Sequence, residues 1–131
     1  MKSGTLIAII ILSGYVALEA YTIRKASQRM EPAYIHNLLV EAKAATELCN
    51  STALELESRF ARTLQRATDS YAKDLLENNS DLSAKAVEEQ IEQQTVAARL
   101  TATEAVNTDG CSHPDSKAQF QRYRIYARKS R

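Results

Sequence analysis

The residues best suited to chemistry in this chain are its two cysteines and its two histidines. The cysteines are Cys49 and Cys111, and the histidines are His36 and His113. Thiols and imidazoles in one small protein can form a disulfide, ligate a metal, or build a nucleophile with its general base. Each of these three chemistries requires a different pattern in the surrounding sequence.

The patterns for a metal site and for a nucleophile are incomplete. Cys111-Ser-His113 is an isolated fragment, and His36 is far from it in the sequence, whereas structural zinc sites normally carry paired cysteines or paired histidines at short spacing. Nothing near Cys111 supplies an oxyanion site or a third residue to orient His113. We therefore expect no metal, no cofactor, no small-molecule substrate and no enzymatic activity. A disulfide is the favoured state of the cysteines, and two buried free thiols are the alternative.

The element that carries Cys49 is predicted to be one long helix. The segment from Tyr34 to about Glu77 contains neither Gly nor Pro, and Pro32 suits the first turn of a helix. Asn50-Ser-Thr could restart a helix, but the apolar stripe keeps its phase across this point, so we predict a single helix of about 43 residues and about 65 Å. The stripe comprises Leu38, Leu39, Ala42, Cys49, Ala53, Leu56, Phe60, Leu64, Ala67, Tyr71 and Leu75.

A second helix is predicted to fold back on the first. The polar stretch Glu77–Ser83 offers a turn at 78–82 with Ser83 as N-cap, and Gly110 ends the helix that follows. Two helices joined by a short turn run antiparallel, which predicts a coiled-coil-like hairpin over 34–108. With its turn near residue 80, Cys49 and Cys111 come level with each other. We expect a disulfide there, worth about 4 kcal/mol in the chain-entropy model.

The N-terminal segment is predicted to be a signal-anchor over residues 1–23. Ser3 to Leu18 carry no charge before Glu19, and as a helix they would span about 24 Å, slightly less than the hydrocarbon core of a bilayer. Residues 24–33 would form a basic juxtamembrane linker. A secretory signal cleaved after Ala20 and a buried helix of a soluble fold are the alternatives. The role of Glu19 is left open.

Two signals disagree about membrane orientation. The Lys and Arg residues that follow the apolar segment favour a cytoplasmic C-terminal side, whereas a disulfide favours an oxidising compartment. We give the disulfide more weight and predict a single-pass protein with its C-terminal domain in the periplasm or its equivalent. A secreted protein is the alternative.

The surface of the hairpin indicates where partners could bind. The second helix has one Ala-rich face, with Val96 and Leu100 on nearly the opposite side, and a two-helix hairpin buries only one face of each helix.

After a loop at 109–116, the tail 117–131 carries six basic residues and no acidic one. Its secondary structure is open between helix and strand. A basic cap packed on the acidic hairpin is the favoured interpretation, ahead of binding to anionic lipid, an acidic partner or nucleic acid. The candidate interaction residues are Val96, Leu100, Phe120, Tyr123 and Arg124.

Together these features predict an all-α protein that works by interaction. The leading hypothesis is a small membrane-anchored, exported subunit that docks onto partner proteins or onto copies of itself. A cleaved secreted or periplasmic binding module is the first alternative. The layout is also similar to that of phage inner-membrane spanins, which implies a membrane lysis or fusion subunit as the second alternative.

Overall fold

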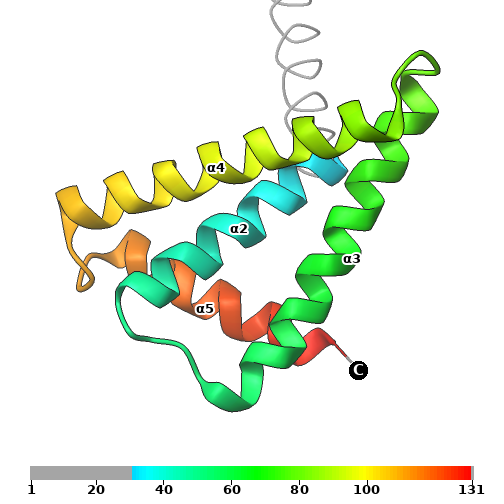
Figure 1. Ribbon diagram of the computed structural model, residues 1–131. Coiled ribbons are helices and arrows are strands. Elements are labelled where there is room, and N and C mark those ends of the chain that lie inside the picture. The colour runs from blue at the N-terminus through cyan, green and yellow to red at the C-terminus, as the bar shows by residue number, and fades with distance from the viewer. Residues whose placement is uncertain (1–30, 131) are drawn as a thin grey trace, which may run out of the picture. The chain divides into compact units, whose positions relative to one another are not determined.

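The computed structural model describes residues 31–130, and this part of the chain is entirely helical (Figure 1). Its elements are α2 (Pro32–Leu48), α3 (Leu54–Asn78), α4 (Ala84–Asp109) and α5 (Pro114–Lys129). The predicted all-α class is confirmed for these residues. The predicted anchor at 1–23 and most of the predicted linker at 24–33 lie outside them. Among the helices described, none combines the length and the apolar character that a membrane crossing requires.

The prediction of one continuous helix from Tyr34 to Glu77 is wrong, because the chain leaves the helix at Asn50. Asn50 has a φ of 51°, in the left-handed region that asparagine tolerates better than most residues. Ser51 N–H donates to the Thr46 carbonyl at 2.9 Å, and Asn50 N–H donates to the Glu47 carbonyl at 3.2 Å. This is the Schellman pattern of a helix C-terminus. The polar Asn-Ser-Thr segment therefore ends α2, and the chain turns before α3.

The other predicted helix ends agree with the structure. Pro32 begins α2, the Ser83 side chain accepts a hydrogen bond from Ala86 N–H at 3.1 Å, and Gly110 terminates α4 with a φ of 83°. The turn between α3 and α4 occupies residues 79–83, close to the predicted turn at 78–82. These ends were predictable because capping depends on residues that are adjacent in the sequence.

The arms of the hairpin do not pack on each other along their length. α3 and α4 diverge from their turn (Figure 1), and near it Tyr71 and Leu75 pack against Val87. Farther from the turn, α2 lies between them, with the His36 ring 5.4 Å from the Tyr71 ring of α3 and its Nε2 3.5 Å from Thr95 Oγ1 of α4. The predicted packing of two helices against each other is thus replaced by one in which α2 lies between α3 and α4 and contacts both.

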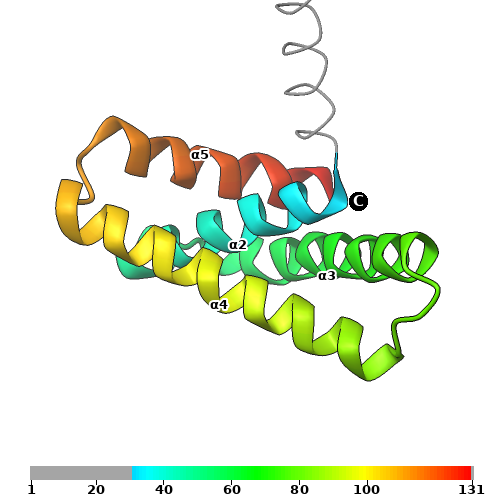
Figure 2. The ribbon, with the colours of Figure 1, turned by 90° about the horizontal axis from the view of Figure 1, so that it is seen from above.

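α2 and α4 run in the same direction, and α5 runs in the opposite direction (Figure 2). Near the start of α2, Asn37 Nδ2 donates to Gln94 Oε1 at 3.4 Å, and just past its end Cys49 is bonded to Cys111. The tail whose secondary structure was left open is a helix, with Pro114 in its first turn and His113 as its N-cap. The predicted loop at 109–116 shortens to residues 110–113.

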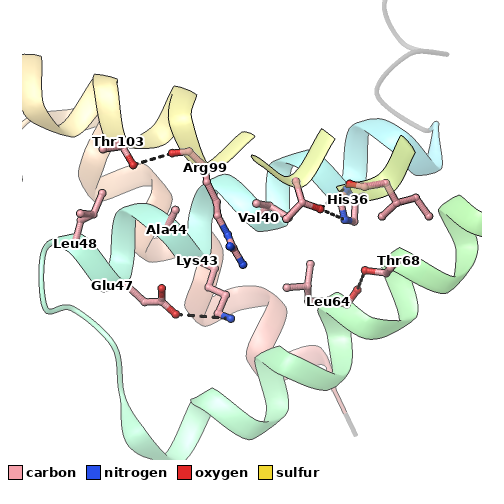
Figure 3. Close-up of a pocket in the computed structure, with 12 residues that line it drawn as sticks. His36, Val40, Lys43, Ala44, Glu47, Leu48, Leu64, Thr68, Arg99 and Thr103 are labelled. Atoms are coloured by element: carbon pink, nitrogen blue, oxygen red, sulfur yellow. Dashed lines mark hydrogen bonds and ion pairs between the residues drawn. The ribbon is translucent and has the colours of Figure 1, made fainter. Parts of the chain in front are cut away.

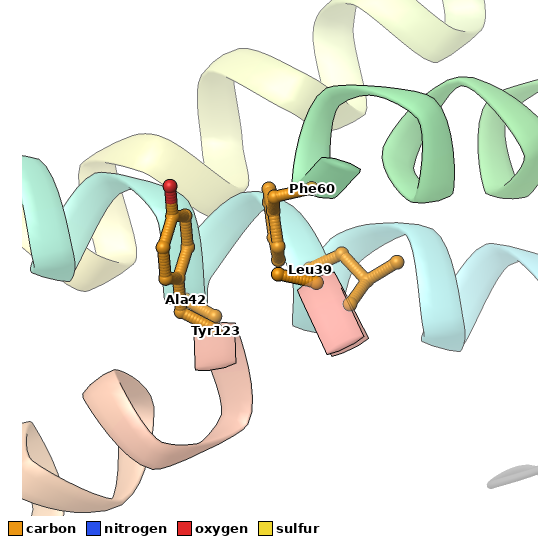
Figure 4. Packing of buried hydrophobic residues seen from close by; sticks show 5 residues of the cluster. Leu39, Ala42, Phe60 and Tyr123 are labelled. Atoms are coloured by element: carbon orange, nitrogen blue, oxygen red, sulfur yellow. The ribbon is translucent and has the colours of Figure 1, made fainter. Parts of the chain in front are cut away.

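The main core lies where α2, α3 and α5 meet. Phe60 and Tyr123 stack with ring centroids 4.4 Å apart and an interplanar angle of 27°, and Leu39, Ala42 and Ala127 complete the buried cluster (Figure 4). Thr63 Oγ1 also donates to the Tyr126 carbonyl at 3.1 Å, which joins α3 to α5. α5 is therefore attached mainly by apolar packing.

Candidate functional site

A groove of about 570 Å³ lies between α2, α3 and α4. It exists because α3 and α4 diverge while α2 covers only part of the space between them. An apolar strip from α2, formed by Val40, Ala44 and Leu48, lies along it, and Leu64 of α3 and Ile91 of α4 extend the strip to the walls. A cavity of this size and character is typical of binding sites for small molecules or partner side chains.

Two cationic side chains reach into this groove. Figure 3 shows Arg99 extending from α4 toward Lys43 of α2. Lys43 Nζ lies 3.7 Å from Glu47 Oε1, whereas among residues 31–130 no carboxylate lies within ion-pair distance of Arg99. The groove therefore presents one cation, Arg99, that has no carboxylate partner among the described residues, and it could receive an apolar group that carries a carboxylate or another acceptor.

The hydroxyl groups along the groove are largely committed to their own helices. The hydroxyls of Thr68, Thr95 and Thr103 donate to the carbonyl oxygens of Leu64, Ile91 and Arg99 at 2.9, 2.8 and 2.8 Å respectively. Each can still accept a hydrogen bond but has no further proton to donate. The cations are thus the groups best able to bind a ligand acceptor.

His36 closes one end of the groove. Its side chain is buried, and its Nδ1 lies 3.1 Å from Asn37 Oδ1. Burial lowers the pKa of His36 below its ordinary value of 6.5, because the charged imidazolium is disfavoured away from water, and the hydrogen bond with Asn37 partly opposes this shift. This histidine therefore serves as a neutral packing group at neutral pH.

The predicted pairing of Cys49 with Cys111 is present, with an S–S distance of 2.06 Å. The predicted route to it is wrong, because Cys49 is not on a long antiparallel arm of a hairpin. α2 and α4 run parallel, so the end of α2 and the loop after α4 meet at the same end of the domain. The thiols are bonded to each other, which removes them as metal ligands or nucleophiles in this state.

The five predicted interaction residues fall into three groups. Val96 and Leu100 are exposed on the outer face of α4, at 58% and 56%, and Arg124 is exposed on α5. Phe120 is half-buried. The prediction of Tyr123 as an interaction residue is corrected by the structure, because its side chain is only 2% exposed and stacks on Phe60. The sequence placed Tyr123 among the candidate interaction residues, but it did not show that Phe60 of α3 would cover this side chain.

Sequence reasoning missed Lys43 and Arg99 as groove residues. No local signal marks them, because they come from different helices and meet only once α2 lies between the arms of the hairpin. It also missed a group formed by Asp109, His113 and Asp115, whose side-chain ligand atoms lie within 4.8 Å of one another. There, His113 Nδ1 accepts from Asp115 N–H at 3.1 Å, so the histidine acts as the cap of α5.

Comparison with known proteins does not assign this chain to a family. No protein-family model matches it, and neither the curated proteins nor the solved structures contain a significant match.

Proposed function

We propose that this protein is a small membrane-anchored subunit whose exported helical domain docks onto a partner protein or onto other copies of itself. The observation that carries the proposal is the exposed pair Val96 and Leu100 on α4 of a domain closed by a disulfide. Residues 96 and 100 are one helical turn apart, so they form a continuous apolar ridge. Such a ridge gains free energy when a partner covers it.

Two further observations support the proposed compartment. A disulfide persists in oxidising compartments and is rare in the cytosol, which favours export of residues 31–130. The uncharged stretch from Ser3 to Leu18 supports an N-terminal signal-anchor. Export with the N-terminus retained in the membrane would hold the domain close to the bilayer surface.

The groove supports docking by a partner that carries acidic groups. Lys43 and Arg99 would bind its carboxylates, and Ala44 and the exposed Leu48 would bind its apolar side chains, whereas Val40 is buried beneath them. Such a partner could be a helix, because Ala44 and Leu48 are one turn apart on α2 and can pack between the ridges of another helix.

Docking is tested by cross-linking the full chain in its native membrane. We expect a cross-linked adduct for the wild type, strong loss of it in Val96→Asp/Leu100→Asp, and weakening in Lys43→Gln/Arg99→Gln. Leu54→Asp is the matched control, because Leu54 is 87% exposed but lies away from the α4 ridge, at the start of α3. An adduct unchanged by both double substitutions would contradict the proposal.

Compartment and anchoring are tested separately. Thiol labelling of intact cells with and without reductant should show that Cys49 and Cys111 react only after reduction by an external reagent. Loss of about 20 N-terminal residues in the intact mass would favour the cleaved secreted module, since signal peptides are removed on export. A lysis defect on deletion would instead favour a lysis or fusion subunit.

A further inference from the structure

One end of the domain carries exposed cations together with exposed apolar groups. The inner side of α5 buries Tyr123 and Ala127, and its opposite side exposes Arg124, Ile125, Arg128 and Lys129. Because Tyr123 is locked against Phe60 at 4.4 Å, the rotation of α5 about its axis is fixed. The same side chains of its last two turns therefore face outward whenever this stack is formed. We call the four exposed residues and Tyr34 the basic end patch.

The packing of α5 leaves the charges of this patch unneutralised. Within residues 31–130, none of Arg124, Arg128 and Lys129 has a carboxylate within ion-pair distance, and Lys129 Nζ lies 5.2 Å from the centroid of the Tyr126 ring. Arg122, two helical turns before Lys129, differs from them, because its charge lowers the pKa of Glu41 against the larger upward effect of burial. The basic tail that was predicted to cap the acidic hairpin is thus held in place by apolar contacts. Most of its cations remain free to bind an anionic partner.

The patch lies at the end of the domain where the described chain begins. α5 is antiparallel to α2, so its C-terminal turns adjoin the first turn of α2 (Figure 2), and Ile35 packs against the cluster that contains Ala127. Tyr34, in that first turn of α2, is also exposed. If the chain is anchored through residues 1–23, the ten or so linker residues can hold this end no farther than about 35 Å from the bilayer.

The composition of the patch favours lipid over nucleic acid. Ile125 is 51% exposed among three cations, and an aliphatic side chain flanked by cations can enter the boundary between headgroups and acyl chains. Surfaces that bind single-stranded nucleic acid instead place aromatic side chains where bases can stack on them, whereas the side chain among these three cations is aliphatic. Tyr34 adds a residue type that is common at membrane–water interfaces.

We infer that the basic end patch binds anionic phospholipid headgroups and holds this end of the domain against the bilayer, with Ile125 inserted at the interface. The inference rests on the proposed function only for the membrane anchor, and it does not depend on which leaflet is involved. Arg124, Arg128 and Lys129 supply the attraction to the headgroups. Since this attraction is electrostatic, it weakens as salt screens it.

The test uses the full chain, which contains no tryptophan, so that a single introduced Trp reports its own environment. Ile125→Trp is the probe, and Leu54→Trp, at a site that is 87% exposed at the start of α3 and outside the α4 ridge, is the matched control. Both are reconstituted into vesicles of phosphatidylcholine alone or mixed with phosphatidylglycerol. We expect a blue-shifted emission and at least a two-fold gain in quenching by brominated lipid for Ile125→Trp in the anionic vesicles, and neither for Leu54→Trp.

A charge test completes the experiment. Adding Arg124→Gln/Arg128→Gln/Lys129→Gln to the probe should abolish the shift, whereas Arg62→Gln/Arg66→Gln/Lys85→Gln, which removes exposed cations of α3 and α4, should leave it. Emission that is the same in both vesicle types overturns the inference, as does a response to duplex DNA but not to vesicles, or an equal shift at residues 54 and 125.

The anchor is tested by flotation of the same samples at high salt. A chain that floats while the Ile125→Trp probe stays unresponsive keeps the anchor and overturns the lipid patch. A chain that fails to float at high salt but whose probe responds at low salt supports the patch and overturns the anchor. A chain that does neither overturns both.

Discussion

His36 of α2 contacts both arms of the hairpin. Its ring lies 5.4 Å from that of Tyr71 and 3.5 Å from the Thr95 hydroxyl. An imidazole in such a place can fill space and accept or donate hydrogen bonds, but its protonation would put a charge into the interior. Protonation of His36 would therefore disturb the packing of α2 against both arms, so the stability of the domain should depend on pH.

The domain should lose stability on mild acidification through His36. Its pKa is lowered in the fold, so between about pH 6.5 and the lower folded-state value the unfolded chain binds more protons, and the free energy of unfolding decreases as the pH falls. Urea unfolding between about pH 7.5 and 5.5 measures this. His36→Gln should flatten the dependence, whereas His113→Asn, which keeps a capping side chain, should not.

Glu41 has the opposite sign and acts at lower pH. Burial raises its pKa above 4.5, against the attraction of Arg122 and a hydrogen bond with Gln119. Its contribution to stability is present at low pH and is lost as the pH rises through the folded-state value. Repeating the titration with Glu41→Gln separates the contribution of Glu41 from that of His36. If the loss of stability on acidification disappeared in Glu41→Gln, His36 would not be its cause.

Tyr123 is the largest fully buried side chain of the described domain. Truncation to Ala should cost about 3–4 kcal/mol, because it removes the stack on Phe60 and leaves a cavity between α3 and α5. Tyr123→Phe should preserve the stack and cost far less. Ile125→Ala, on the exposed side of the same helix, should change the unfolding free energy by no more than about 0.5 kcal/mol. Equal effects at residues 123 and 125, measured by urea unfolding, would contradict this packing.

At the scale of elements, the corner between α2 and α3 decides the fold. If the helix continued through Asn50, the residues after it could not turn back, and α2 could not lie between α3 and α4. The left-handed conformation of Asn50, with its φ of 51°, and the two hydrogen bonds that accompany it stop the helix there. The sequences before and after this corner are ordinary helix formers, and they make up α2 and α3.

The corner should tolerate Gly and reject a β-branched residue. Asn50→Gly keeps access to positive φ and should change stability by about 0.5 kcal/mol or less, whereas Asn50→Val should cost about 1–2 kcal/mol through the clash of its Cβ. Thermal unfolding of the two variants measures the difference. Indistinguishable midpoints would mean that the chain does not need the left-handed residue at this corner.

At the scale of the whole molecule, the disulfide closes the domain. Cys49 and Cys111 are 62 residues apart in sequence, and their bond ties the end of α2 to the loop between α4 and α5. All of α3 and α4 lies within the closed loop. The bond therefore restricts the unfolded chain over most of the domain, while the folded cores are held by separate apolar clusters.

Removal of the disulfide should cost about 4 kcal/mol in the chain-entropy model. Reduced wild type and Cys49→Ser/Cys111→Ser should unfold at similar, lower urea concentrations than the oxidised protein. Reductant should have no effect on the double serine variant, which serves as its control. An unchanged midpoint on full reduction of the wild type would show that loop closure contributes little here.

The sequence by itself determined the all-α class, the start of α2, both ends of α4 and, because it holds only two cysteines, which residues could pair. Helical periodicity, the Ser83 cap and the Gly110 stop are local properties, each set by residues a few positions apart. The apolar stripe could not report the corner at Asn50, because the same residues stay in phase whether the helix continues or breaks there.

Only the tertiary structure decided which faces meet. It placed α2 between the arms of the hairpin, covered Tyr123 with Phe60, brought Lys43 and Arg99 into one groove and left the cations of α5 exposed. These outcomes depend on contacts between residues far apart in the chain, and such contacts follow from the packing of whole helices, which local propensity does not encode.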